Sequence, residues 1–326
     1  MRAIVLDEHG GPEVLQVRTV PDPVPGPEEV LVDVVATALN RADVLQRMGL
    51  YPGPPTEFEI PGLEYAGRVA AVGERVRSWR VGDEVMGIVG GGAYAERLTT
   101  HERAALPVPS TVPLTDAAAL PEVYLTAYDA LVVQGGMTSG RWALVHAGAS
   151  GVGTAAIQIM KAIGARIIVT ASSGKIAACR ELGADVAVDY TSESFVEAVT
   201  EATGGLGVDC VLDVIGGEYL NDNVDAVRVG GRIIQVGVMG QGKADFVLGK
   251  LLPKRAALIG TVLRSRPLEE KIALAQRFRA ELMPLFESGA MGPVIDSRFT
   301  LDDLPAAHER MESNANVGKI LVDVVG

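Results

Sequence analysis

The 326 residues include 29 basic and 41 acidic side chains, so a net charge of -12 disfavours binding to nucleic acid or anionic lipid. With 48% hydrophobic and 21% charged residues, the composition is that of a folded globular protein, and the length favours about two domains. No apolar run is long enough to cross a membrane, and Asp7 and Glu8 interrupt any signal-peptide core, so we expect a soluble cytoplasmic protein. Cys179 and Cys210 lack a CxxC or His pattern, which indicates buried thiols and no disulfide framework or cysteine-rich zinc site.

The first 120 residues contain short, valine-rich apolar runs separated by turn residues. This texture predicts strands. They lie at residues 2–7, 13–20, 29–39, 68–73, 83–89 and 93–100. The proline-rich segment 21–29 is predicted to be an extended surface connection, because proline fixes φ and disfavours helix.

After Pro121 the pattern changes to strand, glycine turn and helix in repetition. The predicted strands are 143–147, 166–171, 186–190, 208–217 and 231–237, and the predicted helices are 151–165, 174–184 and 195–205. Alternating apolar strands and amphipathic helices indicate a parallel sheet with helices on both faces. A helix near 269–287, another at 301–312 and a last strand at 319–326 close the chain.

The first strand of this second region leads into the turn 148–153, which has the pattern G-x-x-G-x-G. The spacing is related to the G-x-G-x-x-G fingerprint of dinucleotide-binding proteins but differs from it. Glycines allow a pyrophosphate to approach the backbone, and the helix that follows offers free N–H groups and a positive dipole end. The turn therefore predicts a nucleotide site; the alternative is a turn of purely structural importance.

The end of the second strand selects between the two nicotinamide cofactors. In NAD-binding proteins an acidic residue there accepts from the ribose hydroxyls. This chain has Ser172, Ser173 and Lys175 and no carboxylate at that point, and a cation with hydroxyl donors suits a 2′-phosphate. We therefore predict NADPH over NADH; the alternative is that Lys175 is only a solvated residue of the next helix.

Several longer stretches make the chain resemble the zinc-free quinone oxidoreductase (zeta-crystallin-like) branch of the medium-chain dehydrogenase/reductase superfamily. They include NRADVLQRMGLYPGPP at 40–55, IPGLEYAGRVAAVG at 60–73, HAGASGVGTAAIQ at 146–158 and NANVGKILV at 314–322. The resemblance implies an α/β fold with a GroES-like, β-rich catalytic domain (1–122 and 264–326). The second domain (123–263) would be a Rossmann domain with a doubly wound parallel sheet that binds NADPH.

The chain departs from the zinc-dependent members of that superfamily. They carry a cysteine where this chain has Asn40, a His-Glu pair where it has Leu63-Glu64, and a cysteine or carboxylate near Glu122. Leucine cannot bind zinc, so we predict no catalytic metal. Without a Lewis acid the electron acceptor must itself be activated, as quinones and α,β-unsaturated carbonyls are.

The resemblance also assigns roles to single residues. Tyr51 matches a position proposed as proton donor in related enoyl reductases, and Asn40 lies in the same segment that lines the active cleft. The residues that match cofactor-binding positions are Thr126, Ala149, Ser150, Gly151, Val152, Ser172, Lys175, Tyr190, Ile215, Gly216, Gly237, Val238, Met239, Leu263, Arg264 and Asn316.

The functional prediction is a zinc-independent NADPH:quinone reductase that acts on a small molecule. The first alternative is reduction of an enone or enoyl thioester, which Tyr51 would favour. The second is an NADPH-binding sensor or structural protein without turnover. From the family we expect a homodimer, and we nominate the apolar strand at 256–263 as the edge that pairs.

Overall fold

The computed structural model describes residues 1–53 and 55–324, and the chain divides into two compact units. Unit 1 consists of Met1–Glu122 and Arg264–Gly326, and unit 2 consists of Val123–Leu263. Residues 325–326 of the predicted last strand lie outside the described part of the chain.

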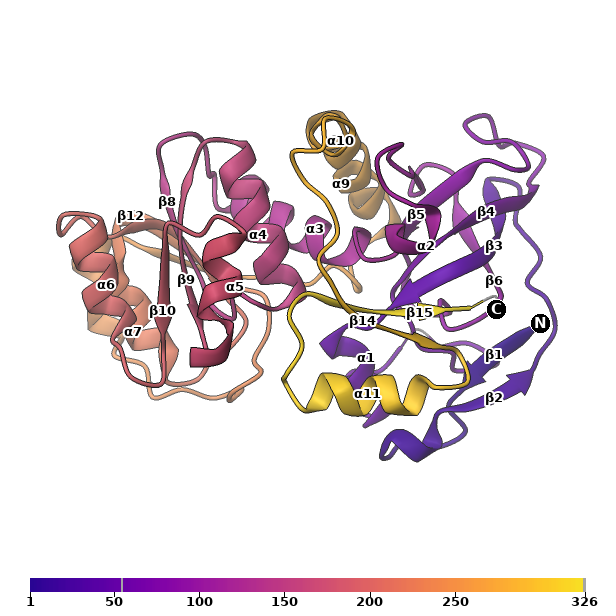
Figure 1. The fold of residues 1–326 in the computed structure, drawn as a ribbon, viewed down its shortest axis with the longest axis horizontal. Coiled ribbons are helices and arrows are strands. Elements are labelled where there is room, and N and C mark those ends of the chain that lie inside the picture. The colour runs from indigo at the N-terminus through magenta and orange to yellow at the C-terminus, as the bar shows by residue number, and fades with distance from the viewer. Residues whose placement is uncertain (54, 325–326) are drawn as a thin grey trace. The chain divides into compact units, whose positions relative to one another are not determined.

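Unit 1 is built on a largely antiparallel sheet in the order β14-β15-β3-β4-β5-β7, with β6 paired to β3 and a separate hairpin-like pair β1-β2 (Figure 1). The strands are β1 (Arg2–Val5), β2 (Gln16–Thr19), β3 (Glu29–Ala38), β4 (Glu64–Val72), β5 (Glu84–Ile88), β6 (Arg97–His101), β7 (Leu106–Pro107), β14 (Ile295–Thr300) and β15 (Lys319–Asp323). The C-terminal strand β15 pairs antiparallel with β3, so residues from the two ends of the chain meet at the end of β3.

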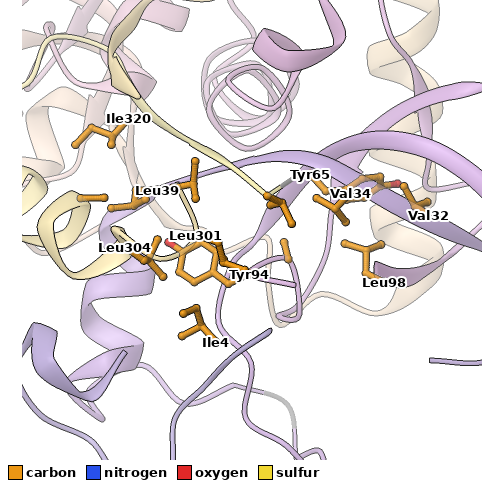
Figure 2. Close-up of a cluster of buried hydrophobic side chains, with 14 of the residues drawn as sticks. Ile4, Val32, Val34, Leu39, Tyr65, Tyr94, Leu98, Leu301, Leu304 and Ile320 are labelled. Carbon is orange, nitrogen blue, oxygen red and sulfur yellow. The ribbon is translucent and has the colours of Figure 1, made fainter. Parts of the chain in front are cut away.

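The core of unit 1 follows from the alternation of apolar side chains along these strands. In β3 the even-numbered valines 30, 32 and 34 are fully buried, while the intervening positions are partly exposed. They join a cluster in which Tyr65 and Tyr94 lie among aliphatic side chains from the N-terminal strand and the C-terminal helix (Figure 2).

The helices of unit 1 are short except for α9. They are η1 (Pro12–Val14), α1 (Arg41–Arg47), α2 (Leu114–Ala117), α9 (Leu268–Glu281), α10 (Met283–Glu287) and α11 (Leu304–Glu312). Helix α1 begins directly after β3 and is tied to α11 by Arg47, whose buried guanidinium lies 2.9 Å from Glu312. Helix α3 (Pro121–Tyr128) crosses the boundary between the units in the chain.

Unit 2 contains a six-stranded parallel sheet in the order β10-β9-β8-β11-β12-β13. The strands are β8 (Trp142–Val145), β9 (Arg166–Ala171), β10 (Val186–Asp189), β11 (Val208–Asp213), β12 (Val227–Gln235) and β13 (Ala257–Gly260). Between them lie α4 (Gly151–Ala162), α5 (Ile176–Glu181), α6 (Phe195–Ala202), α7 (Tyr219–Ala226) and α8 (Leu251–Lys254), with η2 (Asp129–Gln134), η3 (Ser173–Lys175) and η4 (Leu248–Lys250). Helices α4 and α5 cover one face and α6 and α7 the other (Figure 1), which is the doubly wound arrangement predicted.

The predicted fold class is confirmed, and some of the local differences from the predicted elements have clear physical reasons. The predicted strand 13–20 shortens to β2 because Pro12–Val14 forms a 3-10 turn. The predicted helix 269–287 divides into α9 and α10 at Leu282, because the Pro284 ring cannot continue the helix. Helices α1 and α7 and strand β14 were not predicted, because their apolar positions are too few to show a clear period.

Both cysteines are buried and free, as predicted. Within residues 1–53 and 55–324, no helix combines the length and apolar character needed to cross a bilayer.

Candidate active site and cofactor site

The glycine turn of unit 2 joins the end of β8 to the start of α4. Ser150 caps the helix, because its hydroxyl oxygen accepts the N–H of Gly153 at 3.1 Å. The turn is also bound to the neighbouring strand, since the N–H of Gly148 donates to the carbonyl of Thr170 at 2.8 Å. The first N–H groups of α4, at Gly151 and Val152, have no acceptor inside the helix, so this end of the helix suits an anion.

At two positions of the turn the surrounding atoms leave no room for a Cβ, so glycine is required there. A Cβ on Gly153 would lie 2.4 Å from the carbonyl oxygen of Ala147, and a Cβ on Gly148 would lie 2.5 Å from the Val169 side chain. Ala147 itself has φ of 57°, an uncommon conformation for a residue with a side chain. The close fit of helix against strand is the geometry that a dinucleotide pyrophosphate requires, so these residues suit such a cofactor.

The end of β9 carries the residues predicted to select the nucleotide. Ser172 precedes η3 and makes no capping hydrogen bond there, and Lys175 ends that turn. Ser173 is already engaged, because its hydroxyl donates to Asp189 at 2.5 Å. That bond, with others from Thr191, lowers the pKa of Asp189 at the end of β10. Of the two serines that the sequence offered for a 2′-phosphate, Ser172 is therefore the one with an available hydroxyl.

The remaining predicted cofactor residues of unit 2 follow the carboxyl ends of other strands. Ile215 and Gly216 come after β11, Gly237–Met239 after β12, and Tyr190 after β10. Tyr190, Val238 and Met239 are 49%, 55% and 48% exposed, which is high for apolar and aromatic side chains. Thr126 lies in α3, and Leu263 follows β13 and is buried. Ligands of doubly wound sheets bind at this edge, so the unit gathers these loops at the expected place.

Unit 1 brings together three polar side chains at the end of β3. The Lys319 ammonium, at the start of β15, donates to Asn40 Oδ1 at 2.8 Å and lies 2.7 Å from Glu64 Oε1. The Asn40 amide Nδ2 donates to the same Glu64 oxygen at 2.8 Å. Lys319 is 3% exposed and Glu64 is fully buried. Both ends of the Asn40 amide are therefore held, and its orientation is determined.

Two further carboxyl groups border this cluster. Asp43 is fully buried; its Oδ2 accepts the N–H of Asn40 and the hydroxyl of Tyr94, whereas its Oδ1 has no partner. Burial raises the pKa of Asp43 to about 6. Burial and the Glu64 charge together raise the pKa of Glu122 to about 8. Unit 1 thus holds two carboxyl groups whose pKa values lie near neutral pH beside the buried Lys319 ammonium.

Tyr51 is held by Arg264. The guanidinium lies 4.9 Å from the centre of the tyrosine ring and donates to the Tyr51 carbonyl at 3.2 Å. It also donates to the Gly90 carbonyl and to Gln46 Oε1, both at 2.7 Å. Burial raises the pKa of the phenol above its ordinary value of 10.0, and the Arg264 charge opposes that rise. The hydroxyl therefore remains protonated at neutral pH and can donate.

Two of the residues predicted to bind the cofactor, Arg264 and Asn316, belong to unit 1 and form hydrogen bonds within it. Arg264 donates to residues 46, 51 and 90, as described above. The Asn316 amide donates to the Gly318 carbonyl at 3.0 Å.

Lys319 and Asp213 are not among the residues predicted from the sequence, yet both are buried and hydrogen-bonded at these sites. The signal in the sequence that could have identified them is a charged residue within or beside an apolar run, as in KILVD and VLDV.

The donor set of unit 1 does not suit zinc. Leu63 replaces a metal ligand of the zinc-dependent relatives, and the Lys319 ammonium already contacts both Asn40 and Glu64. Among the described residues no group of three or more His, Cys, Asp or Glu side chains could hold a metal ion.

Comparison with known proteins agrees with this architecture. The family model "Alcohol dehydrogenase GroES-like domain" matches residues 26–110, and "Zinc-binding dehydrogenase" matches residues 151–280. The chain is 32% identical to a quinone oxidoreductase of Lama guanicoe over 99% of this chain and 97% of that protein.

Solved structures give the same result. Escherichia coli quinone oxidoreductase complexed with NADPH superposes with a TM-score of 0.89 at 30% identity, covering 99% of this chain and 100% of that chain. CurK enoyl reductase superposes with a TM-score of 0.88 at 28% identity, covering 99% and 98%.

A larger protein also contains a similar segment. The chain is 32% identical to part of a phenolphthiocerol/phthiocerol polyketide synthase of Mycobacterium tuberculosis, and it spans 14% of the length of that relative. The match to the quinone oxidoreductases, in contrast, runs through almost the whole of both chains. This chain belongs to the quinone oxidoreductase branch of the medium-chain dehydrogenase/reductase superfamily, a group of oxidoreductases.

Proposed function

We propose that the protein is a zinc-independent reductase that uses NADPH to reduce a quinone. The observation that carries this proposal is the Lys319 ammonium held between Asn40 and Glu64. A buried cation with two partners there, beside Leu63, leaves no ligand set for a Lewis acid. The acceptor must then be one whose conjugation already disperses the incoming charge.

NADPH would be held by unit 2. The N-terminal end of α4 suits the pyrophosphate, and Ser172 with Lys175 suits the 2′-phosphate. When bound, the nicotinamide supplies a hydride. The loops after β11 and β12 would border that half of the cofactor, as would Thr126, and Leu263 would belong to the segment that covers the cofactor.

Unit 1 would meet the acceptor with Tyr51 and Asn40. A protonated phenol can donate to the oxygen that gains negative charge when the acceptor is reduced. Arg264, against the ring face and bonded to the Tyr51 carbonyl, keeps that phenol in one place. Asn40 has one amide hydrogen on Glu64 and a second that makes only a 3.4 Å contact with the Ala38 carbonyl. That second hydrogen would be the one offered to the acceptor.

Reduction of an enone or enoyl thioester is the second candidate. The similarity to CurK enoyl reductase and to part of a polyketide synthase supports it, and the Tyr51 phenol would serve there too. A homodimer is also proposed, paired through β13, because this strand is at the sheet edge and Leu258 and Val262 are 44% and 42% exposed. The cytoplasmic location stays a prediction.

The test follows oxidation of NADPH and, separately, NADH by the chelator-treated protein with ortho- and para-quinones, simple enones and an enoyl-CoA. We expect NADPH-specific quinone reduction. Turnover of enoyl thioesters alone would favour the second candidate, and binding of NADPH without any turnover would favour a sensor. Activity that requires added zinc would refute the metal-independent reaction.

A variant tests the cofactor preference. Lys175→Ala should weaken NADPH binding about tenfold or more and leave NADH binding unchanged, because hydrogen bonds to charged groups contribute about 1.5–3 kcal/mol. Isothermal titration with both nucleotides measures this. An equal loss for both would show that Lys175 does not read the 2′-phosphate.

A further inference from the structure

Four polar side chains are buried in a row beneath the loops of unit 2 that are proposed to hold the cofactor. Thr170, His146, Asn223 and Asp213 are all 1% exposed or less. They lie near the carboxyl ends of β9, β8 and β11 and in α7. The turn before α4 comes shortly after His146 in the chain, Thr170 is the penultimate residue of β9, and the loop after β11 follows Asp213 directly.

Hydrogen bonds join the four side chains. His146 Nδ1 lies 3.1 Å from the Thr170 hydroxyl, and His146 Nε2 lies 2.7 Å from Asn223 Oδ1. The amide Nδ2 of Asn223 donates to Asp213 Oδ2 at 2.9 Å. The other Asp213 oxygen, Oδ1, accepts the backbone N–H groups of Ile215 at 2.6 Å and Gly216 at 3.0 Å.

The donor and acceptor roles of these groups allow the hydrogen bonds of the row to run in one direction only. A carboxylate only accepts, so the Asn223 amide must present its NH₂ to Asp213 and its oxygen to His146. His146 must then donate from Nε2 and accept at Nδ1 from the Thr170 hydroxyl. Burial lowers the pKa of His146, so the ring is neutral and has one tautomer.

The surroundings indicate what the row is for. The Phe195 and Tyr219 rings pack against the imidazole in T-shaped geometry with ring centroids 4.9 Å apart, and buried aliphatic side chains surround them. A buried polar network whose groups are all hydrogen-bonded makes its surroundings rigid and selects one arrangement of the backbone that it holds. Here Asp213 holds the backbone of Ile215 and Gly216, and His146 lies two residues before Gly148, the first residue of the glycine turn.

We propose that Asp213, Asn223 and His146 are positioning residues, which orient the loop after β11 relative to the glycine turn so that both meet a dinucleotide. This role rests on the proposed function, because it presupposes that the loops bind the cofactor. The row would act on the cofactor only through the backbone of residues 215 and 216, whose N–H groups donate to Asp213.

The experiment compares two substitutions. Asn223→Leu keeps a similar side-chain volume but removes the hydrogen bonds of residue 223 to His146 and Asp213. It should raise the Kd for NADPH about tenfold, which corresponds to the free energy of about one hydrogen bond. Asp213→Asn can keep every bond by reversing the row: residue 213 would donate to Asn223, Asn223 to His146 Nε2, and His146 Nδ1 to Thr170. It should keep the Kd within about threefold, since no bond is lost.

A spectroscopic signature separates positioning from general stability. In protein with ¹⁵N-labelled histidine, of which the chain has four, the proton of His146 should move from Nε2 to Nδ1 in Asp213→Asn. Val227→Ala is the matched control, because Val227 is fully buried at the amino end of β12 and its loss destabilises the same sheet. This variant should lower the melting temperature and leave the Kd unchanged.

Two results would overturn the inference: an unchanged Kd in Asn223→Leu, or a proton that stays on Nε2 in Asp213→Asn. If Asn223→Leu does not fold, Thr170→Val cuts the row at its far end with almost no change of volume and should still raise the Kd. If the unaltered protein bound neither nucleotide, the proposed function would fail. The tautomer measurement needs no cofactor and would still report whether the row has its direction.

Discussion

Replacing Lys319 by methionine should destabilise unit 1 strongly. The ammonium lies 2.7 Å from Glu64, and the two side chains are 3% and 0% exposed. At an effective dielectric constant of about 20, the attraction between the two charges is about 6 kcal/mol, which is an upper figure. Removing one partner of a buried pair costs about 3–5 kcal/mol, because the other charge stays buried. We expect about 3 kcal/mol, since Asn40 and the Glu122 N–H still donate to Glu64.

The two tryptophans allow this loss to be measured in unit 1 alone. Trp79 lies in unit 1 and Trp142 in unit 2, so a Trp142→Phe background leaves one fluorophore that reports the unfolding of unit 1 in urea. The double variant Lys319→Met/Glu64→Gln removes the uncompensated charge and should recover about 2 kcal/mol or more. A loss below about 1 kcal/mol in the single variant, or a double variant no more stable than it, would refute the reasoning.

Three further predictions concern protons and the glycine turn. The pKa of Glu122 is raised from 4.5 in the unfolded chain to about 8 in the folded protein, so protonation of Glu122 stabilises the fold fully below pH 4.5, and this contribution is lost as the pH rises to about 8. In Glu122→Gln the urea midpoint, read from Trp79 fluorescence, should therefore fall less steeply over this pH range. Parallel curves for the variant and the unaltered protein would contradict this. Gly153→Ala should weaken NADPH binding and destabilise unit 2 by about 1–3 kcal/mol, since the new Cβ meets backbone atoms. Gly249→Ala, where nothing lies within 4 Å, is its control, and equal effects of both would show that space is not the cause. Tyr51→Phe should lower kcat about 100-fold or more with little change in NADPH affinity, as loss of a proton donor does; full kcat/KM would remove that role.

The parts of the structure that the sequence predicted are those determined by residues close together in the chain. The turn 148–153 can be recognised because its glycines, its preceding strand and its helix occupy one continuous segment. The strands of unit 2 are apolar runs bounded by glycines, and β9 begins and ends at the residues predicted, Arg166–Ala171. Segments of this kind carry their own periodicity and turn residues, so one sequence is enough.

The polar clusters could not be predicted in the same way, because they depend on which strands are neighbours and in what register. Lys319 meets Glu64 and Asn40 only because β15 and β4 pair with opposite edges of β3. Asp213 and His146 each come at the end of an apolar run, and they lie beside each other because Leu212 is opposite Val145 in the parallel pair β11 and β8. The polar residue that ends a buried strand was visible in each case. The partner of each such polar residue depends on the order of the strands in the sheet. In a doubly wound sheet that order brings the carboxyl ends of the strands together at the place where ligands bind. Buried polar residues at these ends therefore merit the same attention in a sequence as the glycines of the turn, since both fix the backbone at the edge where doubly wound sheets bind their ligands.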